Sequence, residues 1–446
     1  MSLYSDTIFA LSSAPGRSAL SVIRISGEQA FYVVKKLTKN KIKTFDHRTT
    51  SLTSIYCKNN NLIDKVVLAF YCQPNSYTGE NLVEITTHGN PVIIDSVFNT
   101  LMEFGLRLAN PGEFTNRAHS NKKIDLIQAE SILTTINAKS QTGVRASLLG
   151  VAGKLSKKLE DTKKLLILSL GELEYELDIS EVDNRDTVLK RAEKNIRKTV
   201  VKIEKLIESH DKTSILTDGA KIVITGAPNV GKSTLLNALT NSERAIVSDT
   251  PGTTRDTIES LTYFSNYPVL LIDTAGIRKT KNHVERIGVD KAKKEIITSN
   301  IIFDIQSETK SKNQDTDASK TIKIFNKADL MTKKNKKALQ KKDPNCIIIS
   351  AKHKTGLNKL RKRTISLLNE KTDSTEPFFL SSKRQQTALK RSKEHLEKAL
   401  KKESLVELEI VAHNLRLALS EFDWVLGKTT TDDILNSVFS GFCVGK

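Results

Sequence analysis

A glycine-rich loop that follows an apolar segment constrains the fold of this chain more than any other feature. Residues 221–225 form an apolar run typical of a buried strand, and residues 226–233 follow with the pattern G-x-x-x-x-G-K-S. In such a loop the glycines let backbone N–H groups surround phosphate oxygens, the lysine neutralises the phosphates, and the serine hydroxyl ligates Mg²⁺. The sequence therefore predicts a P-loop, with candidate contacts at Asn229, Val230, Gly231, Lys232, Ser233 and Thr234.

Three further motifs follow this loop, each directly after an expected strand. In the first, D-x-x-G, the carboxylate of Asp273 is expected near Mg²⁺ and a backbone N–H near the γ-phosphate. In the second, N-K-x-D, Asp329 accepts hydrogen bonds from the ring N1–H and the exocyclic amine of guanine, which adenine does not offer. The third, S-A-K, closes on the other face of the base. Together they predict GTP as the ligand, through Asp273, Thr274, Ala275, Gly276, Asn326, Lys327, Ala328, Asp329, Ser350, Ala351 and Lys352.

The hydrolytic side of this site departs from that of small GTPases. Those proteins place a glutamine just after D-x-x-G to orient the attacking water, but Ile277 and Arg278 stand here. An apolar side chain does not position water, so another group must do so. Charge neutralisation between the β- and γ-phosphates, given elsewhere by an arginine finger, must also have another source.

Composition limits the class of protein. With 446 residues, of which 38% are hydrophobic, the chain is long enough for two or three domains with real cores. It has no run of about 18 apolar residues and no signal-peptide pattern, so we expect a cytoplasmic protein with no membrane partner. The four cysteines are scattered without metal-ligand spacing, which argues against a disulfide framework or a zinc site.

The formal charge of +19 is unevenly distributed. Residues 217–370 hold 28 basic and 16 acidic residues, an excess of 12, much of it between residues 333 and 363. A basic excess can indicate RNA binding, but lysine-rich solvated helices give the same composition. Charge alone does not decide between them.

Periodicity predicts the organisation of the rest of the chain. Residues 1–119 read as mixed α/β, with strands at 20–25, 66–70 and 82–85. Leucines at three- and four-residue steps predict a long helix over 155–177, and leucines with an alanine and a phenylalanine at the same steps predict another over 405–422. A further helical stretch is expected from about 187 to 210. We expect the two helical blocks to form one discontinuous helical domain, 120–215 and 371–446, with a GTPase domain inserted at 216–370.

Several longer motifs resemble one family. They are residues 249–256 (D-T-P-G-T-T-R-D), 273–278, 284–288 and the terminal F-C-V-G-K at 442–446. N-terminal motifs agree, at 14–17, 22–27, 74–80 and 111–118. Over nearly its whole length the chain is similar to the MnmE (TrmE) family of tRNA-modification GTPases, with an N-terminal α/β folate-binding-like domain, a helical domain and an inserted Ras-like P-loop GTPase domain.

The resemblance implies a reaction and partners. A homodimer pairs with a FAD-dependent partner of the MnmG (GidA) type, as a heterotetramer in which FAD is held by the partner only. Together they add a (carboxymethyl)aminomethyl group at C5 of the wobble uridine of tRNA. The one-carbon unit comes from a tetrahydrofolate derivative, 5-formyl or 5,10-methylene, bound by the N-terminal dimerisation domain. Matching motif positions place Arg24, Glu84, Lys123 and Lys446 at the folate.

The resemblance also implies which groups orient the attacking water and neutralise the charge between the phosphates. Family members are activated by K⁺ and dimerise through their nucleotide domains. Asn229 would bind K⁺ with Ser248, Thr250 and Thr253, and the cation would replace an arginine finger. Thr254 would join Ser233 on Mg²⁺, while Glu285 would orient the water as the catalytic residue. The GTP contacts then include a switch segment formed by Ser248, Asp249, Thr250, Pro251, Gly252, Thr253 and Thr254.

Some features depart from the family pattern or stay open. Cys443 reads either as a reactive thiol or as a small residue lining the folate pocket, and a prenylation signal does not fit its context. Asn81 and Asn90 stand where the family usually has Asp and Gly. Asp304 interrupts the expected strand 301–305, and the connection 306–319 is polar and short for a helix.

Two other functions fit parts of the sequence. A ribosome-assembly GTPase would share the switch motifs, but such proteins append an RNA-binding module with a G-x-x-G loop, and residues 371–446 contain none. A nucleotide-gated scaffold or membrane-associated switch would need no folate pocket. Folate binding by residues 1–119 therefore separates such a scaffold or switch from a tRNA-modification GTPase.

Overall fold

The structure is a computed structural model that describes residues 6–179, 185–240, 259–273, 295–306, 318–372, 380–401, 407–429 and 432–446. The chain divides into two compact units. The first comprises Met1–Leu133, Leu149–Ile203 and Thr387–Lys446, and the second comprises Thr134–Leu148 and Glu204–Gln386. No described helix is long and apolar enough to cross a membrane.

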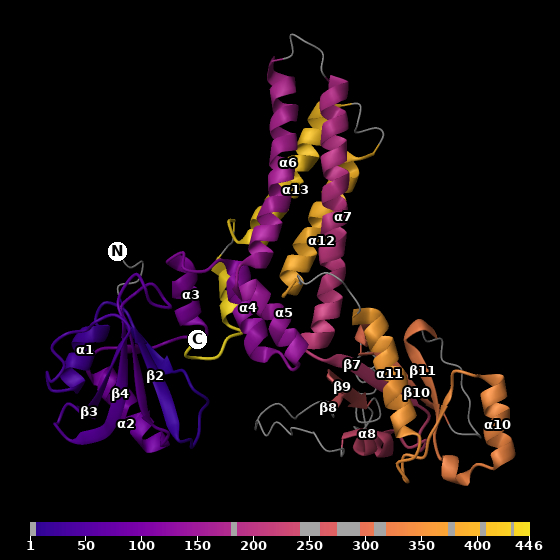
Figure 1. Cartoon of the computed structure of the whole chain (residues 1–446), viewed down its shortest axis with the longest axis horizontal. Helices are drawn as coiled ribbons and strands as arrows, with labels where there is room; N and C mark the ends of the chain where they lie inside the picture. The colour runs from indigo at the N-terminus through magenta and orange to yellow at the C-terminus, as the bar shows by residue number, and fades with distance from the viewer. Residues whose placement is uncertain are drawn as a thin grey trace, which may run out of the picture. The chain divides into compact units, whose positions relative to one another are not determined.

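The first unit begins with a six-stranded sheet of order β3-β4-β5-β2-β1-β6 (Figure 1). Along its central strands alternate side chains are buried, as the sequence pattern predicts for a sheet with one face on a core. That core contains Phe9, Ile23, Ile25, Val83 and Ile85. The elements are β1 Ile8–Leu11, β2 Leu20–Ser26, α1 Ala30–Leu37, β3 Thr49–Tyr56, β4 Leu62–Tyr71, β5 Leu82–His88, α2 Pro91–Glu103, β6 Arg107–Leu108 and α3 Glu113–Ser120.

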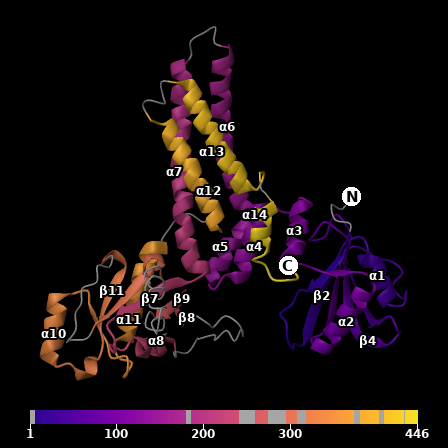
Figure 2. The same cartoon turned by 180° about the vertical axis from the view of Figure 1, so that it is seen from behind.

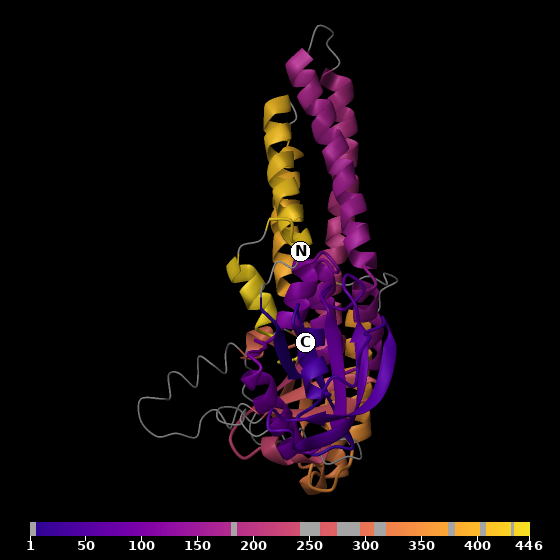
Figure 3. The same ribbon diagram turned by 90° about the vertical axis from the view of Figure 1, so that its left-hand side faces the viewer.

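The predicted helices are present. Helix α6 spans Lys154–Ile179, α7 spans Arg185–Thr217 and α13 spans Leu408–Leu426. Helices α6 and α7 extend beyond the predicted ranges at both ends, whereas α13 begins at Leu408, and the predicted start at 405 lies outside the described residues. Helix α13 packs along α6, and Figures 2 and 3 show them side by side, with Lys163 and Asp423 forming an ion pair of 2.5 Å between them. Helices from both sides of the nucleotide segment thus form one bundle, as predicted. The other helices are α4 Leu126–Asn137, α5 Gln141–Val151, α12 Lys383–Ala399 and α14 Asp432–Phe439.

The second unit contains a six-stranded sheet of order β12-β11-β10-β7-β9-β8. Every pairing is parallel except that of β8 with β9. The P-loop, N-K-x-D and S-A-K loops follow the carboxyl ends of β7, β11 and β12, and Asp273 ends β9, so these motif residues lie at one edge of the sheet. The elements are β7 Ala220–Gly226, α8 Lys232–Thr240, β8 Glu259–Phe264, β9 Tyr267–Asp273, β10 Ile301–Gln306, η2 Ala318–Lys320, β11 Thr321–Phe325, η3 Ala328–Leu330, α10 Lys333–Lys342, β12 Ile347–Ile348 and α11 Leu357–Thr372.

Asp304, which interrupts the apolar run of β10, is accommodated in the sheet. All six residues of β10 are buried, and Asp304 pairs in register with Thr225 on β7 and Lys323 on β11. Its carboxylate accepts a hydrogen bond of 2.7 Å from Nε2 of Gln306. Because a buried carboxylate with a hydrogen-bond donor costs far less than an unpaired one, the strand forms despite the polar residue. The connection at 307–317 lies outside the described residues.

Candidate functional site

The P-loop joins β7 to α8 at the carboxyl edge of the second sheet. Gly226 has a φ of +142°, and a Cβ there would lie 2.2 Å from the carbonyl oxygen of Ile305, so only glycine fits. The ammonium of Lys232 donates to the carbonyl oxygens of Gly226 at 3.0 Å and Ala227 at 2.8 Å. The lysine charge therefore lies over the loop whose backbone would receive phosphate oxygens, and the exposed Asn229 has a left-handed φ of 63°.

Asn326 connects three of the four motif loops. Its Nδ2 donates to the carbonyl oxygen of Val230 in the P-loop at 2.8 Å. Its Oδ1 accepts from the backbone N–H of Ala351 in the S-A-K loop at 3.0 Å. A Cβ on Gly231 would lie 2.3 Å from Nδ2, so the loop approaches the amide as closely as glycine permits. This buried side chain fixes the phosphate-binding loop and the base-binding loops in one arrangement.

The carboxylate that the sequence predicts to read guanine lies beside the S-A-K loop. Asp329 is exposed, and it accepts a hydrogen bond of 2.5 Å from the hydroxyl of Ser350. That hydrogen bond is the main reason why the pKa of Asp329 lies below its ordinary value, so the carboxylate is ionised at neutral pH. Lys327 adopts a left-handed φ of 62°, and Ala328 N–H donates to the carbonyl oxygen of Ile349 at 2.9 Å. The edge of the sheet thus presents an acceptor suited to the donors of guanine.

Two oxygen ligands face each other below the P-loop. The hydroxyl of Ser233 donates to Oδ2 of Asp273, which is 1% exposed, at 2.8 Å. A hydroxyl and a carboxylate are hard oxygen donors, which suit Mg²⁺ held partly by substrate phosphates. The other predicted contacts on this side lie outside the described residues: Ser248, Asp249, Thr250, Pro251, Gly252, Thr253, Thr254, Thr274, Ala275, Gly276 and Glu285.

A second group of predicted site residues meets in the first unit. Arg24 on β2 and Glu84 on β5 are register partners and form an ion pair of 2.7 Å. The guanidinium also lies over two aromatic rings, 5.3 Å from the centroid of Tyr77 and 5.7 Å from that of Phe114. An arginine held between a carboxylate and two aromatic rings is oriented for a planar or anionic ligand.

The C-terminal segment reaches this ion pair. The hydroxyl of Ser12 donates to the carbonyl oxygen of Gly445 at 2.9 Å, and a Cβ on Gly445 would lie 2.2 Å from the carbonyl oxygen of Leu11. The pKa of Lys446 is lowered, first by burial and then by the charge of Arg24. Three of the four residues predicted for folate are therefore together, whereas the exposed Lys123 lies against Gly79. Cys443 is exposed, and its backbone carbonyl accepts from Gly112 N–H at 3.4 Å.

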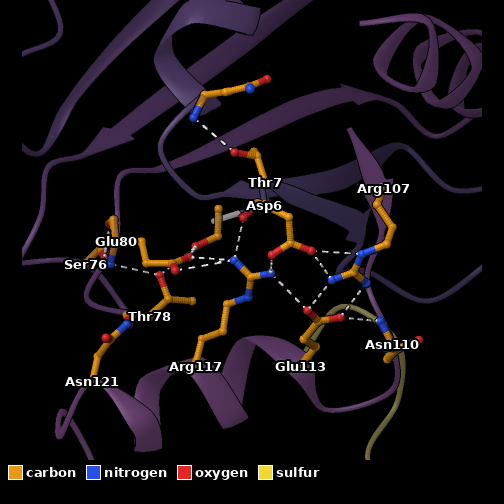
Figure 4. Close-up of polar contacts among 12 residues, drawn as sticks. Asp6, Thr7, Ser76, Thr78, Glu80, Arg107, Asn110, Glu113, Arg117 and Asn121 are labelled. Carbon is orange, nitrogen blue, oxygen red and sulfur yellow. Dashed lines mark hydrogen bonds and ion pairs between the residues drawn. The ribbon is translucent and has the colours of Figure 1, made fainter. Parts of the chain in front are cut away.

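A buried ionic network lies behind this site (Figure 4). Arg117 on α3 is fully buried, and its guanidinium reaches three carboxylates, which belong to Asp6, Glu80 and Glu113. Arg107 adds hydrogen bonds to Asp6 and Glu113. Burial raises the pKa of Glu113, but the hydrogen bonds from Arg107, Asn110 and Arg117 hold it below its ordinary value. The buried charges are thus paired, as a stable interior requires.

The network connects to the aromatic rings around Arg24. Glu80 lies in the same loop as Tyr77 and accepts from the hydroxyl of Ser26 at 2.8 Å. Helix α3 carries Phe114 and Thr115, whose hydroxyl lies 2.9 Å from that of Tyr77. Both rings that face Arg24 therefore belong to segments that Arg117 holds together.

The motifs at 74–80 and 111–118 contain Glu80, Glu113 and Arg117 but predict no role for them, and Asp6 and Arg107 lie outside the motifs. The signal that could have found the network is the acid–base pair Glu113 and Arg117, four residues apart in the short helix α3 and both buried. Their partner Asp6 is 111 residues from Arg117, so no local pattern could have revealed that contact.

Comparisons with known proteins cover almost the whole chain. The family profile for the MnmE helical domain matches residues 126–443, and the profile for the GTP-binding protein TrmE N-terminus matches residues 7–123. The tRNA modification GTPase MnmE of Fervidobacterium nodosum is 36% identical over 99% of this chain and 98% of its own length. The proteins of that name from Aquifex aeolicus and Thermotoga maritima are each 35% identical over 99% of this chain and 100% of their own lengths.

A solved structure, the G domain of the T. maritima FeoB iron transporter, covers 33% of this chain and 98% of that chain at 22% identity, with a TM-score of 0.24. A score this low carries no argument, so the GTPase fold rests on the strand order and the four motif loops. Full-length relatives above 30% identity and a helical-domain match over more than half of the sequence decide the family. The chain belongs to the MnmE (TrmE) family of tRNA modification GTPases.

Proposed function

We propose that this protein hydrolyses GTP as part of the modification of tRNA wobble uridines. The observation that carries the proposal is the convergence of the P-loop, N-K-x-D and S-A-K loops through Asn326, in a chain that matches tRNA modification GTPases over 99% of its length. If the protein hydrolyses GTP but cells without it keep their wobble modification, a role in ribosome assembly would be the remaining function. Mass spectrometry of wobble nucleosides in cells that lack the protein tests the proposal.

In the proposed nucleotide site, each described side chain has a role. Lys232 leaves the two carbonyl oxygens of its loop to neutralise the β- and γ-phosphates. Ser233 and Asp273, with the predicted ligand Thr254, would hold Mg²⁺, which would supply charge neutralisation at those phosphates when bound. Asp329 accepts from guanine. Since a carboxylate left opposite adenine would lose these hydrogen bonds, ATP is rejected.

For hydrolysis we propose a K⁺ site formed by Asn229, Ser248, Thr250 and Thr253, with Glu285 orienting the attacking water. The absence of a glutamine at position 277 supports this assignment, as does the position of Asn229 in the P-loop with its side chain exposed. The cation would occupy the place that an arginine finger takes in other GTPases. Two nucleotide domains of a homodimer would close on each other to order the switch segment.

For the modification itself we propose that Arg24, Glu84, Lys446 and Lys123 bind a tetrahydrofolate derivative, 5-formyl or 5,10-methylene. The ion pair of Arg24 with Glu84 and the rings of Tyr77 and Phe114 support a ligand that is both planar and anionic. Tetrahydrofolate supplies a one-carbon unit when bound, and these residues bind and orient it. A FAD-dependent partner of the MnmG type would complete the complex on tRNA in the cytoplasm, and the proposed domains are 1–119, 120–215 with 371–446, and 216–370.

A further inference from the structure

Helix α10 has a composition unlike that of any other helix that the structure describes. Its ten residues, Lys333–Lys342, include six lysines and no acidic residue. None of the ten is buried, although the helix contains Ala338 and Leu339. The six lysines are Lys333, Lys334, Lys336, Lys337, Lys341 and Lys342.

The usual sources of helix stability are weak in α10. A helix shorter than about 12–15 residues is marginal in water, and in proteins it is normally stabilised by packing of an apolar face. Polar contacts hold the ends of α10, because Thr332 accepts from Asn335 N–H at 3.2 Å and Asp343 pairs with Lys323 at 3.4 Å. Packing therefore does not explain why this segment is a helix.

The charges of α10 oppose its own fold. Lys333, Lys337 and Lys341 are four residues apart, so they form a row with a spacing of about 6 Å along the helix. Like charges at this separation destabilise a helix. Lys333 and Lys334 also lie in the first turn, where the helix dipole is positive. Among the described residues no carboxylate forms an ion pair with any lysine of α10, so the repulsion is not relieved within this part of the chain.

The position of α10 leaves this row available to a partner. The helix begins four residues after Asp329, and Figures 1 and 2 show it at the outer edge of the second unit, on the far side of β11 from α8. It contributes none of the residues assigned to GTP or Mg²⁺. An anion bound along its surface would relieve the repulsion without disturbing the nucleotide site.

We propose that α10 is a docking surface for the phosphate backbone of tRNA, an inference that rests on the proposed function. A membrane-binding helix needs a broad apolar face, and a protein interface usually has an apolar or aromatic core, but α10 offers only Ala338 and Leu339. A row of lysines without apolar neighbours instead suits a sequence-independent contact with a chain of phosphates. The surface anchors tRNA and does not read its bases.

The test compares two triple variants of the full-length chain. In the first, Lys333→Gln, Lys337→Gln and Lys341→Gln remove the row on α10. In the second, Lys190→Gln, Lys194→Gln and Lys198→Gln remove an equally spaced, exposed row from α7, where Glu193 and Arg197 already pair. Each variant loses three positive charges, and glutamine matches lysine in helix propensity. Thermal unfolding checks that both remain folded.

Affinity for an unmodified tRNA transcript is measured by fluorescence anisotropy at several salt concentrations. We expect the α10 variant to bind about tenfold more weakly at low salt, with a plot of log affinity against log salt that is shallower by about 2. The α7 variant should bind as the wild type does. Basal GTP hydrolysis should be unchanged in both variants.

Unchanged tRNA affinity in the α10 variant would overturn the proposal and assign the helix to an acidic protein surface or to solvent. Equal losses in both variants would also overturn it, because net charge and not this surface would then explain binding. The proposed function is tested separately by wobble modification in cells. If the wild type restores modification while the α10 variant binds tRNA normally, only the docking surface is wrong.

Discussion

At the scale of single residues, Asn326 has the largest structural role in the nucleotide site. Its amide is buried, donates to Val230 and accepts from Ala351, so it satisfies polar backbone groups of two separate loops. Leaving such buried groups without partners costs about 1–3 kcal/mol each. The N-K-x-D motif therefore holds the P-loop and the S-A-K loop together, in addition to its proposed role in base recognition.

Asp329 determines which base is accepted. We predict that Asp329→Asn weakens GTP binding by about 100-fold and improves binding of xanthosine triphosphate, because the amide then meets an acceptor on the base. Competition titrations with GTP, ATP and xanthosine triphosphate measure the change. Ser350→Ala, which removes only the hydrogen bond to Asp329, should keep the preference for guanine. Equal affinity of the wild type for ATP and GTP would contradict this assignment.

Asn229 is the described residue of the proposed K⁺ site. We predict that hydrolysis is faster in K⁺ than in Na⁺, since Na⁺ is too small for a cage of loop and phosphate oxygens. Asn229→Ala should remove this difference and leave the slow rate in Na⁺ unchanged. Steady-state hydrolysis in matched chloride salts measures both. Turnover of the wild type that is indifferent to the cation would exclude the K⁺ site.

At the scale of elements, the ionic network of Figure 4 fixes the wall of the second site. It joins Asp6 in the segment before β1, the loop that carries Glu80, and α3, through a fully buried Arg117. Because the same loop and helix carry Tyr77 and Phe114, the orientation of Arg24 depends on ion pairs that do not contact it. The network therefore links the stability of this part of the chain to its ligand site.

This network predicts how stability responds to acid. The pKa values of Asp6 and Glu113 lie below their ordinary values of 3.8 and 4.5, so both groups stabilise the fold above those values. That contribution is lost as the pH falls through the lower, folded-state values. We predict that Glu113→Gln destabilises the protein by about 1–3 kcal/mol at pH 7 and flattens the loss of stability below about pH 4.5.

Urea unfolding followed between pH 3 and 7 measures this effect, and Glu103→Gln, an exposed change on α2, is the matched control. The variant and the control should differ most at neutral pH and converge in acid. A Glu113→Gln variant with the same acid dependence as the wild type would mean that the network does not stabilise the fold.

Comparing the helices, strands and loops with the sequence patterns shows which features the sequence could predict. Apolar spacing predicted α6 and α13 because the leucines of that pattern lie on the buried side of each helix. Local motifs predicted the P-loop and base-reading loops because each follows its own strand. Contacts between distant segments, such as Ser12 with Gly445 at a separation of 433 residues, depend on the topology and leave no local pattern. The family resemblance, and not the residues alone, brought Arg24, Glu84 and Lys446 together as one site.

At the scale of the whole molecule, the proposed cation site ties hydrolysis to assembly. In this proposal a facing nucleotide domain holds the switch segment when GTP and K⁺ are bound, so GTP with K⁺ should bring two nucleotide domains together and GDP should release them. These domains carry the largest basic excess, 28 against 16 residues over 217–370, so their approach requires bound triphosphate or salt to screen the repulsion.

The Glu285→Ala variant should separate GTP hydrolysis from dimerisation of the nucleotide domains. We predict that the variant still dimerises its nucleotide domains with GTP and K⁺, while single-turnover hydrolysis slows by at least about 100-fold, because only water orientation is removed. Light scattering with a transition-state mimic measures assembly on the same sample. Hydrolysis at the wild-type rate would assign water orientation to another group, with Arg278 the next candidate.

The measurement that tests the central claim most directly is mass spectrometry of tRNA wobble nucleosides in cells that lack this protein. Cells without it should lose the (carboxymethyl)aminomethyl group at C5 of their wobble uridines. The wild-type chain should restore it, and Lys232→Ala, which removes the charge over the P-loop, should not. Wobble uridines that stay fully modified without the protein, or full restoration by Lys232→Ala, would contradict a GTP-dependent role in this modification.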